Sequence, residues 1–184
     1  MKHDDPEILT GGNSNRVIKE GSTVLRDTGA WSPFVHDLLR YLTAAGFTES
    51  PMLLQADDKQ ERLTFIDGEV GHYPLKPYMQ SDEILVEAAQ LLRRLHDITQ
   101  HFIIPPNSTF QHPFNPGGDH EVICHNDFAP YNHVFKDQHL VGIIDFDVAS
   151  PGTRLWDIAY AVYRYAPLTN PQHTLDCGWH PTPD

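Results

Sequence analysis

Two segments of the chain carry apolar residues at the spacing of an amphipathic helix. The first runs from Trp31 to Gly46, where Ser32 can cap the start and Pro33 suits the first turn. Its apolar stripe consists of Phe34, Val35, Leu38, Leu39, Leu42 and Ala45. The second segment runs from Ser81 to Gln100, and its stripe consists of Ile84, Leu85, Ala88, Leu91, Leu92 and Leu95. We expect the second helix to be a buried central element.

Short β-favouring runs surround the first helix. One hairpin is expected from Arg16–Lys19 and Thr23–Arg26, and a second from Pro51–Gln55 and Arg62–Ile66, with the charged segment Ala56–Glu61 as its turn. The first part of the chain therefore predicts a small antiparallel sheet with one helix.

The second part of the chain predicts one more hairpin and one more helix. His133–Phe135 and Leu140–Ile144 are apolar runs around a polar turn, and residues 71–78 and 101–120 have the composition of irregular linkers. A last helical stripe with the character of core consists of Trp156, Ile158, Ala159, Ala161, Val162 and Tyr165. The fold class is α+β.

Composition narrows the class of partner. A net charge of −12 argues against nucleic acid and would attract a cationic ligand. No apolar stretch approaches the roughly 20 residues of a membrane span, and the first residues do not resemble a signal peptide, so we expect no membrane partner and a cytoplasmic location. The two cysteines indicate no disulfide framework, and Cys124 is expected to be a buried thiol.

Three oxygen-bearing side chains stand in the order that metal-assisted phosphoryl transfer requires. Asn132 lies five residues after Asp127, and Asp145 lies thirteen residues after Asn132. A carboxylate can accept or orient the proton of an attacking hydroxyl, while a carboxamide and a second carboxylate can hold Mg²⁺. Asp127 and Asn132 could instead only shape a turn. Asp145, placed after an apolar strand, favours the catalytic interpretation.

Histidines near this segment invite other interpretations. A zinc site is not supported, because no tight pairing occurs among His112, His120, His125 and His133. His96, in the second helix, is expected to be a structural histidine with a satisfied hydrogen bond.

At these residues the chain resembles the aminoglycoside phosphotransferase and choline kinase group, relatives of the protein kinases. The resemblance rests on the loop His125–Asn132, on the Ile144-Asp145 pair, and on Gly152–Ala159, which matches a Gly-x-x-x-x-Asp-hydrophobic-Ala pattern. The usual glycine after the loop histidine is Asn126 here. Together with Trp31-Ser32-Pro33 and the Leu91–Asp97 helix, the pattern looks most like a bacterial trifolitoxin-immunity-like phosphotransferase subfamily, a label that implies no substrate.

The resemblance implies a protein-kinase-like fold of two lobes, with ATP and Mg²⁺ as cofactors. The N-lobe would span residues 1–69, with a small antiparallel sheet, and the mainly helical C-lobe residues 70–184. Asp127 would be the catalytic residue, Asn132 and Asp145 the metal ligands, and His125 and Asp157 the supports of the loop.

The resemblance also implies where ATP binds. A glycine-bearing hairpin with Gly11, Gly12 and Asn13 would cover the phosphates, and Arg26, with Lys19 as a rival, would contact them. Adenine would bond to hinge backbone near Ile66 and Gly68.

Two departures from the family pattern stand out. The first helix lacks the glutamate that usually holds the ATP-binding cation. His36 or Asp37 could replace it, although both are expected to face solvent. Relatives usually continue for several more helices, whereas this chain ends soon after Pro167, so we expect a shortened C-lobe whose exposed apolar surface favours a homodimer.

Three functional hypotheses follow. The leading one is ATP- and Mg²⁺-dependent phosphate transfer to a hydroxyl of a small molecule. The alternative is a nucleotide-binding pseudokinase or immunity-type binding protein without turnover. A metal-dependent hydrolase that uses the same carboxylates is the third and weakest.

Overall fold

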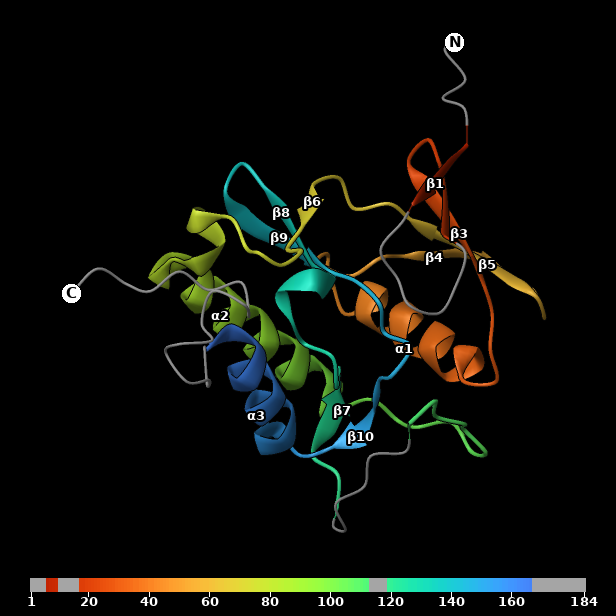
Figure 1. The fold of residues 1–184 in the computed structure, drawn as a ribbon. Coiled ribbons are helices and arrows are strands. Elements are labelled where there is room, and N and C mark those ends of the chain that lie inside the picture. The colour runs from red at the N-terminus through yellow and green to blue at the C-terminus, as the bar shows by residue number, and fades with distance from the viewer. Residues whose placement is uncertain (1–5, 10–16, 113–118, 167–184) are drawn as a thin grey trace.

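The computed structural model describes residues 6–9, 17–112 and 119–166. These residues form an α+β structure with antiparallel sheets and three α-helices (Figure 1). Within the described ranges, no helix has the length and apolar character needed to cross a membrane.

The first part of the chain forms a five-stranded antiparallel sheet. Its spatial order is β1 (Glu7–Leu9), β2 (Val17–Glu20), β3 (Thr23–Asp27), β5 (Gln60–Thr64) and β4 (Leu53–Ala56). Both predicted hairpins are therefore confirmed, and β1 adds an edge strand that the sequence pattern did not indicate. The prediction that Glu61 belongs to a turn is wrong, because this residue lies in β5 opposite Arg26. Glu61 shares the buried face of β5 with Leu63.

Helix α1 (Ser32–Ala44) lies beside this sheet (Figure 1). Its predicted stripe is buried from Phe34 to Leu42, whereas Ala45 is exposed because the helix has ended before it. His36 is also buried, so the expectation that it faces solvent is wrong. Asp37 remains half-exposed and pairs with Arg40.

The second part of the chain is built around α2 (Asp82–Thr99). The side chain of Ser81 caps this helix by accepting a hydrogen bond from the N–H of Ile84. Before it come β6 (Glu69–Val70) and the short 3-10 helix η1 (Pro77–Gln80). After it come β7 (Val122–Cys124), the 3-10 helix η2 (Pro130–Asn132), β8 (His133–Lys136), β9 (His139–Ile143), β10 (Ser150–Gly152) and α3 (Arg154–Tyr165).

Two small sheets hold the loops of this part in place. The predicted hairpin β8–β9 is confirmed and pairs with β6, while β7 pairs with β10. The predicted boundary between the two lobes, at residues 69 and 70, falls inside β6, which pairs with β8. The division into lobes therefore stays a prediction. Cys124 in β7 is buried, as expected.

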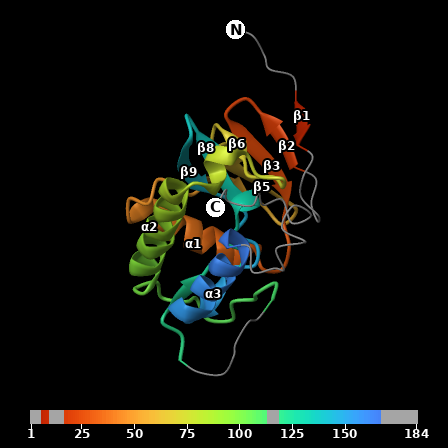
Figure 2. The same ribbon diagram turned by 60° about the vertical axis from the view of Figure 1, so that its left-hand side comes forward.

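Helices α2 and α3 lie next to each other, as Figure 2 shows. Only one face of α3 is buried, through Asp157, Ala161 and Tyr165. The prediction that Ile158, Ala159 and Val162 belong to the core is wrong, and so is that for Leu85 of α2, since all four are exposed. Leu85, Ile158 and Val162 instead line a groove between the two helices.

Candidate active site

The loop between β7 and η2 is held by one buried carboxylate. Asp157 lies in the first turn of α3, is fully buried, and accepts hydrogen bonds from the backbone N–H groups of His125 and Asn126, each at 2.9 Å. The same carboxylate contacts Nε2 of His96 at 2.9 Å. The prediction that His96 is a satisfied structural histidine is confirmed.

Asn126 stands where the resembled family usually has a glycine, and its backbone conformation explains why asparagine fits there. Its φ is +64°, in the left-handed region that asparagine tolerates better than most residues. Its Nδ2 donates to the carbonyl of Val148 at 2.9 Å and to the hydroxyl of Ser150 at 2.8 Å. The asparagine therefore keeps the backbone shape and adds hydrogen bonds to Val148 and to Ser150, the first residue of β10.

Asp127 accepts hydrogen bonds on both carboxylate oxygens. Nδ2 of Asn132 donates to Oδ2 at 2.8 Å, and the hydroxyl of Tyr160 donates to Oδ1 at 2.7 Å. The hydroxyl of Tyr131 donates to Oδ1 as well. The two tyrosine oxygens lie 2.9 Å apart, so the carboxylate has one fixed orientation.

Asp145 is brought to this loop by its neighbour Ile144. The N–H of Ile144 donates to the carbonyl of Asn132 at 2.9 Å, and Nε2 of His125 contacts the carbonyl of Ile144 at 3.1 Å. Asp145 itself has a φ of +63°, which turns the chain after the strand. The structure thus brings the side chains of Asp127 and Asn132 into contact, and the backbone of Ile144 places Asp145 beside this loop.

The oxygens at this place suit a magnesium ion. Asn132 uses Nδ2 for its hydrogen bonds with Asp127, and its Oδ1 makes none with the described residues. Asp145 keeps 46% of its side chain exposed. A carboxamide oxygen and an accessible carboxylate are hard ligands of the kind that Mg²⁺ prefers. No cluster of three or more His, Cys, Asp or Glu ligands occurs in the described part of the chain.

Arg26 connects the first sheet to these acidic groups. Its guanidinium contacts Glu61 at 2.7 Å, Asp145 at 3.4 Å, and Asp147 in an ion pair. The rival cation, Lys19, lies 4.3 Å above the ring of Phe65. Arg26 is therefore the cation that reaches Asp145.

Glu61 links Arg26 to α1. Its Oε1 binds Arg26, and its Oε2 lies 2.6 Å from Nε2 of His36 in α1. The helix thus holds the cation through an intermediate carboxylate on β5. Burial favours a higher pKa for Glu61, but the hydrogen bond with His36 and the charge of Arg26 outweigh burial and lower it.

Other groups in the site have displaced pKa values. Burial is the main cause that raises the pKa of Asp147, against the opposing charge of Arg26. Burial and the hydrogen bonds with Asp127 raise the pKa values of Tyr131 and Tyr160. Both phenols are therefore neutral donors at neutral pH.

The remaining predicted residues have different positions. Gly11, Gly12 and Asn13 lie outside the described residues. Gly68 has a φ of +154°, and a Cβ there would meet the carbonyl oxygen of Phe135 at 2.5 Å, so the chain passes close to β8. Ile66 packs over Gly142 of β9. The contact between hinge backbone and adenine stays a prediction.

Sequence reasoning missed Glu61, Tyr131, Tyr160 and Asp147 as members of this site. Glu61 alternates with Leu63 on one strand face, which is a signal that could have been used. Tyr131 stands inside the loop motif and Asp147 two residues after Asp145. No local pattern indicates that Tyr160 of α3 reaches Asp127.

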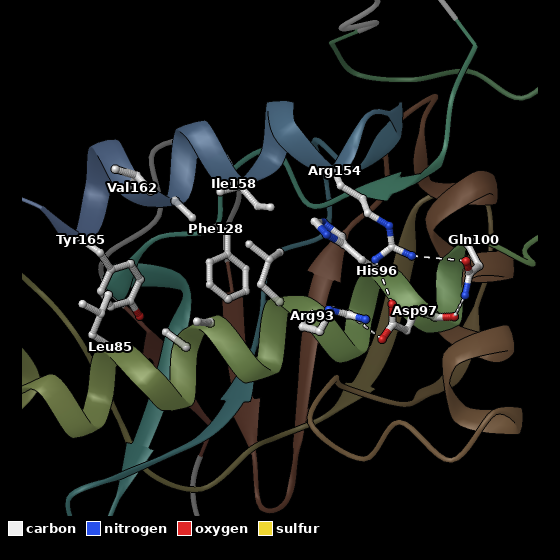
Figure 3. Close-up of a pocket in the computed structure, with 14 residues that line it drawn as sticks. Leu85, Arg93, His96, Asp97, Gln100, Phe128, Arg154, Ile158, Val162 and Tyr165 are labelled. Carbon is white, nitrogen blue, oxygen red and sulfur yellow. Dashed lines mark hydrogen bonds and ion pairs between the residues drawn. The ribbon is translucent and has the colours of Figure 1, made fainter.

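A hollow separate from these residues lies between α2 and α3, as Figure 3 shows. It has a volume of about 820 Å³, and its walls are mainly apolar, with Leu85, Ala88, Leu92, Ile158, Val162 and Tyr165 among them. At one end Arg154 binds Asp97 at 2.9 Å and lies 3.3 Å from Gln100. Asp127, Asn132 and Asp145 do not line it.

Comparison with known proteins gives one family and one close relative. Residues 107–180 match the model of the phosphotransferase enzyme family. The chain is 38% identical over 169 residues to the trifolitoxin immunity protein of Rhizobium leguminosarum bv. trifolii. The match covers 89% of this chain and 63% of that relative, so the chain spans less than two thirds of the relative's length.

Solved structures share the fold at low sequence identity. The streptomycin-ATP-APH(2'')-IIa ternary complex matches with a TM-score of 0.58 and 15% identity, over 90% of this chain and 78% of that one. The ADP-bound aminoglycoside phosphotransferase APH(2'')-Ib matches with a TM-score of 0.58 and 14% identity, over 97% and 81%. A choline/ethanolamine kinase family protein from Mesorhizobium loti matches with a TM-score of 0.62 and 18% identity, over 96% and 69%.

Proposed function

We propose that the chain, whose residues 107–180 match the model of the phosphotransferase enzyme family, transfers the γ-phosphate of ATP, with Mg²⁺, to a hydroxyl group of a small molecule. The observation that carries this proposal is the meeting of Asp127, Asn132 and the Ile144-Asp145 segment at one loop. A module that only binds has no physical need for a base together with both metal ligands.

Each residue has a defined task in the proposed reaction. The acceptor hydroxyl donates its hydrogen bond to Asp127, where Oδ2 accepts from Asn132 and retains a second lone pair. Its oxygen bonds to the γ-phosphorus, the bond from that phosphorus to the β–γ bridging oxygen breaks, ADP leaves, and the hydroxyl proton passes to Asp127.

Each proposed cofactor, Mg²⁺ and ATP, has residues that could bind it. Asn132 and Asp145 would hold Mg²⁺, which supplies neutralisation of the phosphate charge. Arg26, already fixed by Glu61, would contact the phosphates, and Gly11, Gly12 and Asn13 would cover them. Adenine would bind near Ile66 and Gly68.

The support of the loop falls to two further residues. His125 would brace it through Ile144, and Asp157 would hold its backbone. The cytoplasm is the proposed compartment, since ATP is available there.

The test is ADP formation in the presence of Mg²⁺-ATP and a panel of hydroxylated small molecules. Asp127→Ala is expected to lower kcat by at least about 100-fold, the usual contribution of a positioned general base. Asp37→Asn, on the exposed side of α1, is the matched control and should retain turnover. Equal rates for Asp127→Ala and the unchanged protein would contradict the proposed role of Asp127 as the base.

A second candidate is nucleotide binding without turnover. It is favoured by the two tyrosine hydroxyls that already occupy Oδ1 of Asp127 and by the relative that is named for immunity. Calorimetry with Mg²⁺-ATP separates the two candidates. Nucleotide binding with no phosphate transfer to any acceptor supports the binder, whereas phosphorylated product supports the enzyme.

A homodimer is the proposed assembly. Its support is the apolar surface of α2 and α3, where Leu85, Ile158, Val162 and Tyr163 are exposed in the structure. Light scattering should give twice the monomer mass, and Val162→Glu should give the monomer mass. A monomer at all concentrations of the unchanged protein would contradict the dimer.

A further inference from the structure

Aromatic rings and one guanidinium gather next to Asp127. Tyr131, whose hydroxyl donates to Asp127, has its ring 4.9 Å from the guanidinium carbon of Arg164. The rings of Tyr73 and Tyr163 lie 5.3 and 5.7 Å from the same carbon. A single side chain, Tyr131, thus touches both the proposed base and the guanidinium. We refer to Tyr73, Tyr131, Tyr163 and Arg164 as the tyrosine–arginine cluster.

Arg164 differs from the other arginines that the structure describes. Each of those forms an ion pair with a carboxylate, as seen for Arg26, Arg40, Arg62, Arg93, Arg94 and Arg154. Arg164 pairs with no carboxylate in the described part of the chain, and its Nε is buried without a hydrogen-bond acceptor there. A buried donor without an acceptor is unfavourable by itself, and a guanidinium without a carboxylate partner is available to pair with an anion.

Packing alone does not explain why the guanidinium of Arg164 lies among these rings. The end of α3 is already fixed to the linker by its backbone, because the hydroxyl of Tyr73 donates to the carbonyl of Arg164 at 3.0 Å. Stacking on rings attracts the cation but satisfies none of its N–H donors. The fork of a guanidinium matches a carboxylate or phosphate group.

We propose that the tyrosine–arginine cluster binds an anionic group of the acceptor, so that the substrate is a hydroxylated acid of modest size. The proposal rests on the phosphotransferase function proposed above. The acceptor hydroxyl meets Asp127 while its carboxylate, or a comparable anion, meets Arg164. The span between them is bridged by one tyrosine, which suits a short, flat molecule that packs against the rings.

The positive charge of the tyrosine–arginine cluster favours an anionic acceptor, whereas the net charge of the chain led us to expect a cationic ligand. The overall charge of −12 attracts cations at long range. At the acceptor side, however, the positive guanidinium repels an ammonium group, and salt screens the long-range field more than it screens a close contact. The local group therefore decides which acceptor binds.

A matched set of three alcohols tests the proposal. The probes are 4-(hydroxymethyl)benzoate, 4-(hydroxymethyl)benzamide and 4-(hydroxymethyl)benzylamine, which share one shape and differ in charge. Their binding to the full chain without nucleotide is measured by ligand-observed NMR titration. The benzoate is expected to bind about 10-fold more tightly than the other two, as one hydrogen bond between charged groups allows.

Variants assign the preference to Arg164. Arg164→Gln should remove the preference for the benzoate, and Arg164→Lys should keep part of it because the charge remains. Arg40→Gln removes the same charge from an exposed pair on α1 and should keep the full preference. Circular dichroism of each variant verifies folding.

The outcomes separate this proposal from the proposed function. Tighter binding of the benzylamine, equal binding of all three probes, binding of none, or an unchanged preference in Arg164→Gln would each overturn the anionic subsite. ADP formation with an acceptor, dependent on Asp127, is scored separately with Mg²⁺-ATP. Loss of that activity with an intact preference for the benzoate contradicts the transferase and keeps the anion site.

Discussion

Asn126 has a backbone conformation that few side chains adopt, and this limits what can replace it. Its φ of +64° suits glycine best and asparagine next. The asparagine also bonds Val148 and Ser150 through Nδ2. A glycine would keep the loop shape and lose those two bonds.

We predict that Asn126→Ala is less stable than Asn126→Gly by about 1 kcal/mol in urea unfolding. Both variants lose the same side-chain hydrogen bonds, so their difference reports the strain of alanine at positive φ, offset in part by the larger conformational entropy of glycine in the unfolded chain. Equal free energies of unfolding would show that the loop relaxes to a normal φ.

Glu61 is predicted to make stability depend on pH. Its pKa is lower in the folded chain than its ordinary value of 4.5. The unfolded chain therefore takes up a proton first as the pH falls through 4.5, and the stability that Glu61 supplies above this pH is lost below it. Thermal unfolding should show this acid loss, and Glu61→Gln should show less of it.

At neutral pH, Glu61→Gln is expected to cost about 3 kcal/mol, since it removes one partner of a buried charge pair. Asp37→Asn, which removes an exposed carboxylate on α1, should change stability by less than about 0.5 kcal/mol. A loss of stability at acid pH that is identical in Glu61→Gln and the unchanged protein would contradict the role of Glu61 in this pH dependence.

At the scale of elements, α3 fixes the loop between β7 and η2 through its first turn. Thr153 caps the helix, and Asp157 then faces β7, where two backbone N–H groups of the loop meet its carboxylate. The loop shape is therefore set by a helix that begins nearly thirty residues later in the chain.

We predict that Asp157→Asn destabilises the chain by about 3 kcal/mol, because the amide places a donor against donors that need an acceptor. Asp82→Asn is the matched control, since Asp82 is an exposed acid in the first turn of α2. Its loss should cost about 0.5 kcal/mol through the helix dipole. Chemical unfolding that gives equal losses for both variants would refute the role of Asp157.

At the scale of the whole molecule, Arg26 ties the five-stranded sheet to the segment that follows β9. It binds Asp147 and Asp145, which are far from it in sequence. A nucleotide that binds between these groups would stabilise the folded chain as a whole.

We predict that Mg²⁺-ATP at about 100 times its Kd raises Tm by roughly 5–10 °C, from a binding contribution of about 2.7 kcal/mol. Differential scanning fluorimetry should show the shift, and EDTA or Arg26→Gln should reduce it. Lys19→Gln is the discriminating control and should keep it. A shift lost in Lys19→Gln and kept in Arg26→Gln would assign the phosphate contact to Lys19.

The sequence by itself determined the three helices, the main hairpins and the order of the chemical groups. The stripes of α1 and α2, the hairpin β8–β9, and the spacing of Asp127, Asn132 and Asp145 are local patterns, and local patterns follow from helix and strand periodicity. The family resemblance followed from the same short motifs.

Only the tertiary structure decided which distant groups meet. Glu61 connects Arg26 to His36 of α1, Tyr160 reaches Asp127, and Arg164 remains without a carboxylate among the described residues. It also decided that Ile158 and Val162 line a groove rather than a core. A periodic stripe states that a face is apolar, but what covers that face depends on elements packed from elsewhere in the chain, and no local pattern contains their position.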